Sequence, residues 1–174
     1  MSHFIYQHLV HFVALVVLIS RLGDIMTTYL ASPTLRMEAN PIAKWLGWKF
    51  ALATLLAALI PYYSLGAGII VGTMSLLVST SNASKVLLSR ALGEEIFGRL
   101  LNKAVSNTSV RTGLFYTSLP AFFIALLGSM MLVFFPDPCT DWGFYFAVGM
   151  LAYALAVLLW GNLSFLRAKM RPRE

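Results

Sequence analysis

A dense group of polar side chains lies where the first apolar segment of the chain ends, in RLGDIMTTYLASPTLRMEANP (21–41). Arg21 and Asp24 are three residues apart and Thr28 follows one turn later, so a helix would present all three on one face. An ionisable side chain is costly inside a membrane and typically marks the path of an ion or a substrate. These three residues are therefore the first candidates for a functional site.

The end of the same stretch predicts a turn followed by a second helix. Asn40 is a favourable N-cap, and Pro41 suits the first position of a helix. Glu38 lies two residues before that cap, where the positive end of the helix dipole stabilises a carboxylate. We expect Glu38 or Asn40 to lie within about one turn of Asp24, with Pro41 fixing the start of the second helix.

A third segment should form the opposite wall of this site. Small and polar residues recur at every third or fourth position along 65–88, a pattern that lets helices approach closely. This stripe consists of Gly68, Gly72, Ser75, Ser79 and Asn82. Because the first and third segments run toward the same side of the membrane, Asn82 should reach the depth of Asp24.

Together these residues make a set of oxygen donors suited to a hard cation or a proton. The set is Asp24, Thr28, Glu38, Asn40 and Asn82, with Arg21 and Pro41 as structural partners. The structural alternative is that Arg21 and Asp24 only neutralise each other, or that Arg21 extends its charge to the headgroups. In that alternative, Asn40 and Pro41 only begin a helix. No cofactor is expected apart from a bound cation.

A family resemblance rests on the same residues. The pattern D-x-x-T-T from Asp24, followed after nine residues by E-x-N-P ending at Pro41, resembles the signature of a family of small polytopic prokaryotic membrane proteins known only as a domain of unknown function. The resemblance implies that Asp24, Thr28, Glu38, Asn40 and Pro41 form one unit in a prokaryotic cytoplasmic membrane. It implies no activity for that unit.

Other chemistries have less support in the sequence. His8 and His11 lie one turn apart with His3 nearby, but a zinc or haem site needs ligands from another segment, so we expect histidines without a metal. An aspartyl protease needs a second carboxylate that faces Asp24 at membrane depth, and Glu38 lies in a loop. The sequence therefore favours a protein that is not an enzyme.

Composition places the chain in a membrane. Hydrophobic residues make up 59% of the 174 residues and charged residues 11%, far below the roughly 25% of a soluble domain. Five apolar segments approach the roughly 20 residues that cross a bilayer, at about 4–30, 41–62, 65–88, 113–135 and 143–165. We predict an all-α, polytopic bundle of about five transmembrane helices in a single domain over 1–174, with its first helix retained and not cleaved as a signal peptide.

Basic residues predict the orientation. All Lys and Arg residues except Arg21 fall near the links after the first and third segments or in the C-terminal tail. Cytoplasmic loops hold the excess of such residues, so we expect the N-terminus outside and the C-terminus inside. The net charge of +6 then reports orientation and not nucleic-acid binding. Residues 90–111 should form a short amphipathic cytoplasmic helix on the inner surface, and Trp48 and Trp160 should mark the inner headgroup level.

These observations favour a small transporter-like or channel-like protein with a cation- or proton-binding cluster at the cytoplasmic ends of the first three helices. The main alternative is a non-catalytic subunit, surrounded by lipid, that meets a partner or a second copy through the stripe from Gly68 to Ser79. The third alternative is an enzyme that acts on lipid head groups, with Arg36, Lys44 and Arg90 holding a phosphate. The missing D-x-x-D motif counts against this enzyme.

Overall fold

The computed structural model describes residues 3–35, 41–139 and 142–170, which form helices joined by short links. Four of these helices are long: α1 (His3–Ala31), α5 (Leu65–Leu92), α7 (Val110–Phe134) and α8 (Trp142–Met170). All four are long and apolar enough to cross a bilayer. Even α7, with 25 residues, rises about 38 Å against a hydrocarbon core of about 30 Å. The chain is therefore an all-α protein embedded in a membrane.

The apolar segment 41–62, which the sequence predicts as one continuous helix, is divided into short pieces. They are α2 (Pro41–Leu46), α3 (Trp48–Ala53), the 3₁₀ helix η1 (Thr54–Leu59) and α4 (Ile60–Tyr63). Gly47 separates the first two pieces with a φ of 64°, a conformation that costs glycine little and residues with a Cβ much more. The prediction of a single helix is therefore wrong for this segment, and it is confirmed for the other four.

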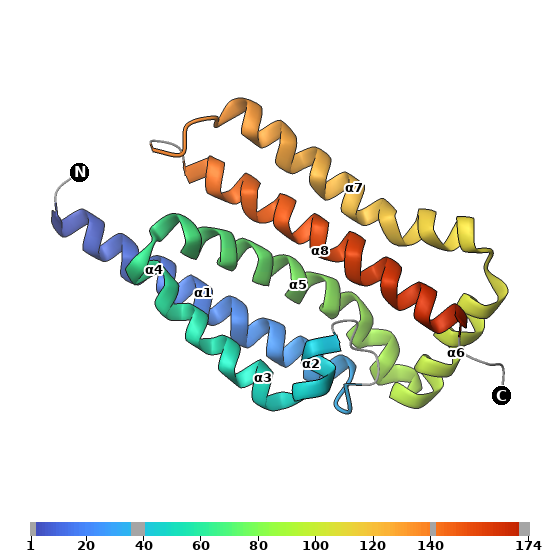
Figure 1. Ribbon diagram of the computed structural model, residues 1–174. Helices are drawn as coiled ribbons and strands as arrows, with labels where there is room; N and C mark the ends of the chain where they lie inside the picture. The colour runs from blue at the N-terminus through green and yellow to red at the C-terminus, as the bar shows by residue number, and fades with distance from the viewer. Residues whose placement is uncertain (1–2, 36–40, 140–141, 171–174) are drawn as a thin grey trace.

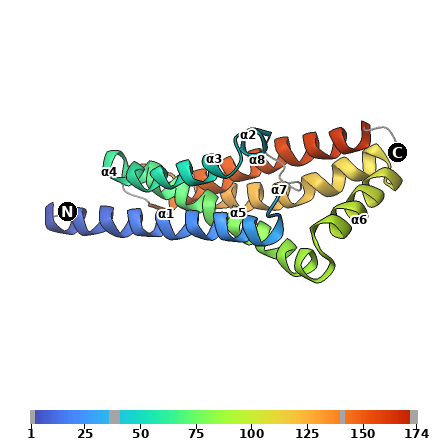
Figure 2. The ribbon, with the colours of Figure 1, turned by 90° about the horizontal axis from the view of Figure 1, so that it is seen from below.

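The long helices lie side by side in the order α1, α5, α8, α7, as Figure 1 shows. The broken segment from α2 to α4 covers one face of the α1 and α5 pair (Figure 2). Val13 and Val17 of α1 pack against Ile69 of α5 in the buried core. The start of α1 and the end of α8 lie at opposite ends of the bundle (Figure 1). The arrangement brings α1, α3, α5 and α8 around one region, where the polar residues gather.

The small-residue stripe of α5 allows this close packing. A Cβ added at Gly68 would lie 2.5 Å from Cγ of Pro61, and one added at Gly72 would lie 3.4 Å from a methyl group of Val17. Ser75, in the same stripe, is completely buried. The stripe therefore packs against other helices of the same chain, as its spacing predicted. A contact with a partner protein through this stripe stays a prediction.

The predicted amphipathic segment forms α6 (Glu94–Asn107). Its one buried residue is Phe97. The helix connects the end of α5 to the start of α7 at one end of the bundle (Figure 2). Lys169 of α8 donates hydrogen bonds from Nζ to the carbonyls of Ser106 at 2.7 Å and Thr108 at 2.8 Å. A cation at this position stabilises the negative end of a helix, so Lys169 fixes the end of α6 to α8.

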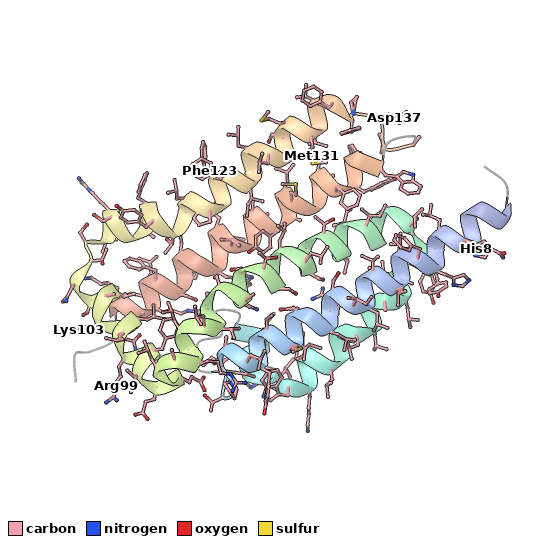
Figure 3. The ribbon with its side chains drawn as sticks, turned by 180° about the vertical axis from the view of Figure 1, so that it is seen from behind. His8, Arg99, Lys103, Phe123, Met131 and Asp137 are labelled. Atoms are coloured by element: carbon pink, nitrogen blue, oxygen red, sulfur yellow. The ribbon has the colours of Figure 1, made fainter. Side chains whose placement is uncertain are left out.

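The outer surface of the bundle is apolar, and its ends are polar. Val133 and Phe134 of α7 are 77% and 72% exposed, as expected for side chains that meet lipid tails. In Figure 3, Arg99 and Lys103 lie at the end of the bundle opposite His8 and Asp137. The basic residues of α6 thus mark one end of the helices.

Candidate functional site

The predicted pair of charges on α1 forms an ion pair. Nη1 of Arg21 lies 3.6 Å from Oδ2 of Asp24, and the two side chains are 22% and 18% exposed. This distance is too long for a hydrogen bond, so the attraction between the charges holds the pair. The prediction that Asp24 packs against Arg21 is confirmed.

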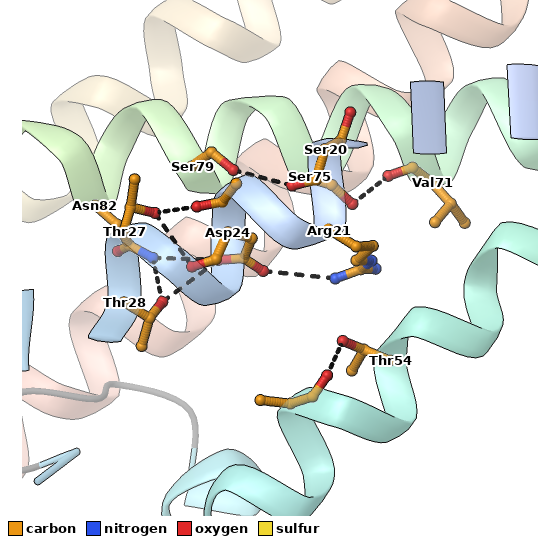
Figure 4. Close-up of polar contacts among 12 residues, drawn as sticks. Ser20, Arg21, Asp24, Thr27, Thr28, Thr54, Val71, Ser75, Ser79 and Asn82 are labelled. Atoms are coloured by element: carbon orange, nitrogen blue, oxygen red, sulfur yellow. Dashed lines mark hydrogen bonds and ion pairs between the residues drawn. The ribbon is translucent and has the colours of Figure 1, made fainter. Parts of the chain in front are cut away.

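Asn82 reaches this pair from α5. Its Nδ2 donates to Oδ1 of Asp24 at 3.3 Å and to Oγ1 of Thr28 at 2.9 Å. Thr28 in turn donates to Oδ1 of Asp24 at 3.5 Å, as Figure 4 shows. We call Arg21, Asp24, Thr28 and Asn82 the Asp24 cluster. Its side chains come from two helices that are far apart in the sequence, and the depth that the stripe predicted for Asn82 is confirmed.

Neighbouring hydroxyl groups donate hydrogen bonds to backbone carbonyls. Thr27 donates to the carbonyl of Gly23 at 2.8 Å within its own helix. Ser79 donates to the carbonyl of Ser20 at 3.2 Å, which joins α5 to α1 beside the cluster (Figure 4). Thr27 is therefore a helix residue and not a member of the cluster, although it stands next to Thr28 in the sequence.

The remaining predicted site residues come from the link between α1 and α2. Glu38 and Asn40 lie outside the described residues, so their distance from Asp24 stays a prediction. Pro41 is the first residue of α2, as expected from its fixed backbone angle. Of the five predicted oxygen donors, the described part of the chain brings together Asp24, Thr28 and Asn82.

A different carboxylate, which sequence reasoning missed, holds the start of that link. Glu94, the first residue of α6, accepts hydrogen bonds from the hydroxyls of Ser32 at 2.5 Å and Thr34 at 2.8 Å. Its other oxygen accepts the backbone N–H of Thr34 at 3.3 Å. No local pattern relates positions 32 and 94. The one available signal was the excess of acid in the first turn of α6, which the helix dipole alone also explains.

A cavity of about 450 Å³ opens beside the Asp24 cluster, between α1, the segment from α2 to η1, α5 and α8. Three sides of it carry polar or aromatic groups that the site prediction did not include. These are Lys85 of α5, Trp48 of α3, and Tyr153 and Trp160 of α8. Trp48 donates from Nε1 to the carbonyl of Pro33 at 3.1 Å. The four members of the cluster therefore form one wall of a larger site.

A second polar cluster joins α7 to α8. Oδ1 of Asn162 accepts hydrogen bonds from Thr117 at 2.5 Å and Ser118 at 3.4 Å, and its Nδ2 donates to Ser118 at 3.1 Å. We call these three residues the Asn162 cluster. It contains no charge, and none of its residues lines the cavity. The pattern of the sequence gave no reason to pair them, because 44 residues separate Ser118 from Asn162.

The histidines of α1 lie far along the helix from the Asp24 cluster. Nδ1 of His11 is 2.9 Å from the hydroxyl of Tyr62 in α4, and the two rings meet edge to face. Within the described residues, no group of three or more His, Cys, Asp or Glu side chains is placed to hold a metal ion. His11 thus helps to join α1 to α4.

Comparisons of the chain with protein-family models, with curated proteins and with solved structures found no match. The resemblance based on Asp24 to Pro41 therefore stays a prediction, and the site has to be interpreted from its geometry alone.

Proposed function

We propose that the protein is a small transporter-like membrane protein that binds its substrate in the cavity beside the Asp24 cluster. Asp24 is the group that binds the coupled cation or proton. The observation that carries this proposal is a pair of charges within a membrane-spanning helix that borders a cavity of about 450 Å³. A charged side chain with a purely structural role is usually surrounded by its partners, because a charge that faces a cavity in an apolar region is costly in free energy.

The contacts of Asp24 give a reason why an ion would change the site. A proton on Asp24 would cancel its charge and leave Arg21 without its counter-charge. A cation bound at Asp24 would compete with Arg21, and the amide of Asn82 would turn so that Oδ1 replaces Nδ2 beside the ion. Either event changes how Arg21 is held, and Arg21 lines the cavity. Binding of an ion and of a substrate would therefore be linked.

The proposed topology has five passes, with the N-terminus outside and the C-terminus inside. Besides the four long helices, the broken segment between α1 and α5 would be the remaining pass. Its part Trp48–Tyr63 is apolar. This part extends roughly 27 Å, because an α-helix rises about 1.5 Å per residue and a 3₁₀ helix about 2.0 Å. Two observations support the orientation: the basic residues of α6 at one end of the bundle, and the charge pattern of the links.

Single cysteines at Ser2 and at Glu174, in a Cys139→Ser background, test this orientation in intact cells. An impermeant thiol reagent should label the first and miss the second, and the reverse result would exclude this orientation.

The ion-binding role of Asp24 is tested by thermal unfolding of the purified protein. Melting temperatures of the wild type and of Asp24→Asn are measured in Na⁺, K⁺, Mg²⁺ and Ca²⁺ and across pH. We expect the wild type to be stabilised by one ion or by a change of pH, and the variant to lose this response while it remains folded. If wild type and variant differ by the same amount in every condition, Asp24 is only a structural partner of Arg21.

The alternative of a non-catalytic subunit is less favoured. It relied on the stripe from Gly68 to Ser79 as a partner interface, and this stripe packs against α1 and α4 in the same chain. An enzyme acting on lipid head groups has no specific observation in its favour. The transporter-like function is therefore the one that the geometry supports best.

A further inference from the structure

The cavity beside the Asp24 cluster has more hydrogen-bond donors than the chain uses. Arg21, Lys85, Tyr153 and Trp160 all line it. None of the four side chains makes a hydrogen bond within the described residues, and of the four Arg21 alone has an ion pair there. Within the described residues, the one buried side-chain donor without a partner is Nε of Arg21. Buried donors normally have partners, so this lining suits a ligand that accepts hydrogen bonds.

The charges on the lining favour an anion. Arg21 and Lys85 are cations, and Asp24 is the one acidic side chain among the described residues of the lining. A guanidinium has five N–H donors, yet Arg21 has a single charged contact at 3.6 Å. Its Nε is buried without a partner in the described part of the chain. An anionic oxygen in the cavity would supply the missing acceptors.

The size and the remaining lining favour a ligand with an apolar body. The volume of about 450 Å³ lies within the range of roughly 300–1,000 Å³ that is typical of small-molecule sites, and a bare ion would leave most of it empty. Trp48, Phe50 and Trp160 contribute aromatic rings, and Met74 and Val78 contribute aliphatic surface. These walls would bury an aromatic or aliphatic group.

We propose that the cavity binds a small organic anion whose carboxylate or phosphate lies between Arg21 and Lys85, with its apolar body against Tyr153 and Trp160. This inference rests on the proposed function, because it names the substrate class of the same site. Arg21 pairs with the bound anion in place of Asp24. The Asp24 carboxylate then binds the coupled proton or cation. Soluble aromatic acids and anionic lipids share this chemistry.

The test uses the purified full-length chain in neutral detergent. Benzoate, phenyl phosphate and benzylammonium are titrated, and the melting temperature is measured. We expect both anions to raise it in a saturable way and benzylammonium to have no effect. Lys85→Gln removes an exposed cation without contacts and should weaken benzoate binding about tenfold, the effect of losing one charge-assisted hydrogen bond. Lys103→Gln, at an exposed position of α6, is the matched control and should leave the affinity unchanged.

Two results would overturn the inference: benzylammonium binding as tightly as benzoate, or an unchanged benzoate affinity in Lys85→Gln. The absence of binding by either anion would overturn it as well. This failure is distinguishable from failure of the proposed function, because the ion and pH response of wild type and Asp24→Asn is measured without an organic probe.

A second arm separates the two sources of the anion. Benzoate binding is measured in nanodiscs of phosphatidylcholine, with and without phosphatidic acid. Loss of benzoate binding only when phosphatidic acid is present identifies an anionic lipid as the ligand. Equal benzoate binding in both identifies a soluble acid. Both results support a site for an organic oxyanion.

Discussion

The Asp24 cluster and the Asn162 cluster place similar polar groups between long apolar helices, but they differ in what they leave unused. In the Asn162 cluster, an amide and two hydroxyls bond to one another without any charge. In the Asp24 cluster, Arg21 keeps a buried N–H without a partner in the described residues, and it borders a cavity. The first arrangement is complete in itself, and the second needs something more.

The two clusters differ in whether a ligand would lower their free energy. A neutral network that satisfies its own donors and acceptors stabilises helix packing and needs no ligand. A charged network with unused donors beside a cavity costs free energy unless a ligand completes it. Function is therefore better indicated by donors without acceptors than by polarity itself.

The largest effect should come from removing the charge of Asp24. Asp24→Ala leaves Arg21 without a counter-charge in a mostly apolar region, and we expect the free energy of unfolding to fall by about 3 kcal/mol. Denaturant unfolding in detergent measures this change. The double variant Arg21→Gln/Asp24→Asn is the control, because it removes both charges and should recover most of the loss. A double variant as unstable as Asp24→Ala would show that charge does not distinguish the two clusters.

A smaller effect is expected when the amide that joins α5 to α1 is removed. Asn82→Ala loses hydrogen bonds to Asp24 and Thr28, and the free energy of unfolding should fall by about 2 kcal/mol. Ser81→Ala is the matched control, because Ser81 also lines the cavity and its hydroxyl makes no described hydrogen bond. Equal losses in both variants would exclude a specific role of the amide.

The Asn162 cluster should tolerate the same change better. Asn162→Ala should lower the free energy of unfolding by about 1 kcal/mol, because Thr117 can keep its hydrogen bond to the carbonyl of Gly113 at 2.9 Å. The melting temperature should respond to ions, pH and benzoate as in the wild type. A variant that loses those responses would contradict the assignment of a purely structural role to this cluster.

The smallest effect should separate two adjacent threonines. Thr28→Val removes the oxygen that accepts a hydrogen bond from Asn82 at 2.9 Å, and we expect a loss of about 1 kcal/mol. Thr27→Val keeps the shape and removes only hydrogen bonds to carbonyls of the same helix, so its effect should stay below about 0.5 kcal/mol. Parallel unfolding curves of the two variants measure the difference. A reversed order would place Thr27 in the cluster instead.

Much of the fold could be predicted from the sequence because its strongest signals are local. Length and hydropathy predicted the four long helices, and helical spacing predicted α6. The break at Gly47 was missed, because an apolar segment with a single glycine is also compatible with a continuous helix. The 3₁₀ turns that follow depend on packing against α1 and α5, which hydropathy does not report.

The candidate site could be predicted only in part, for a related reason. Spacing along single helices brought Asp24, Thr28 and Asn82 to one depth, and the structure joins them. Tyr153 and Trp160 lie on α8, more than a hundred residues from Asp24 in the sequence. Nothing in a single sequence states which face of α8 meets α5, so this wall of the cavity could not be derived.

The attachment of α6 has a mechanical consequence. Glu94 at its start holds the chain just after α1, and Lys169 of α8 holds its last carbonyls. The helix is thus attached at both ends, and its two attachments lead to α1 and α8, which both line the cavity. A displacement of α6 relative to the bundle would therefore have to move the ends of α1 and α8 with it or break these hydrogen bonds.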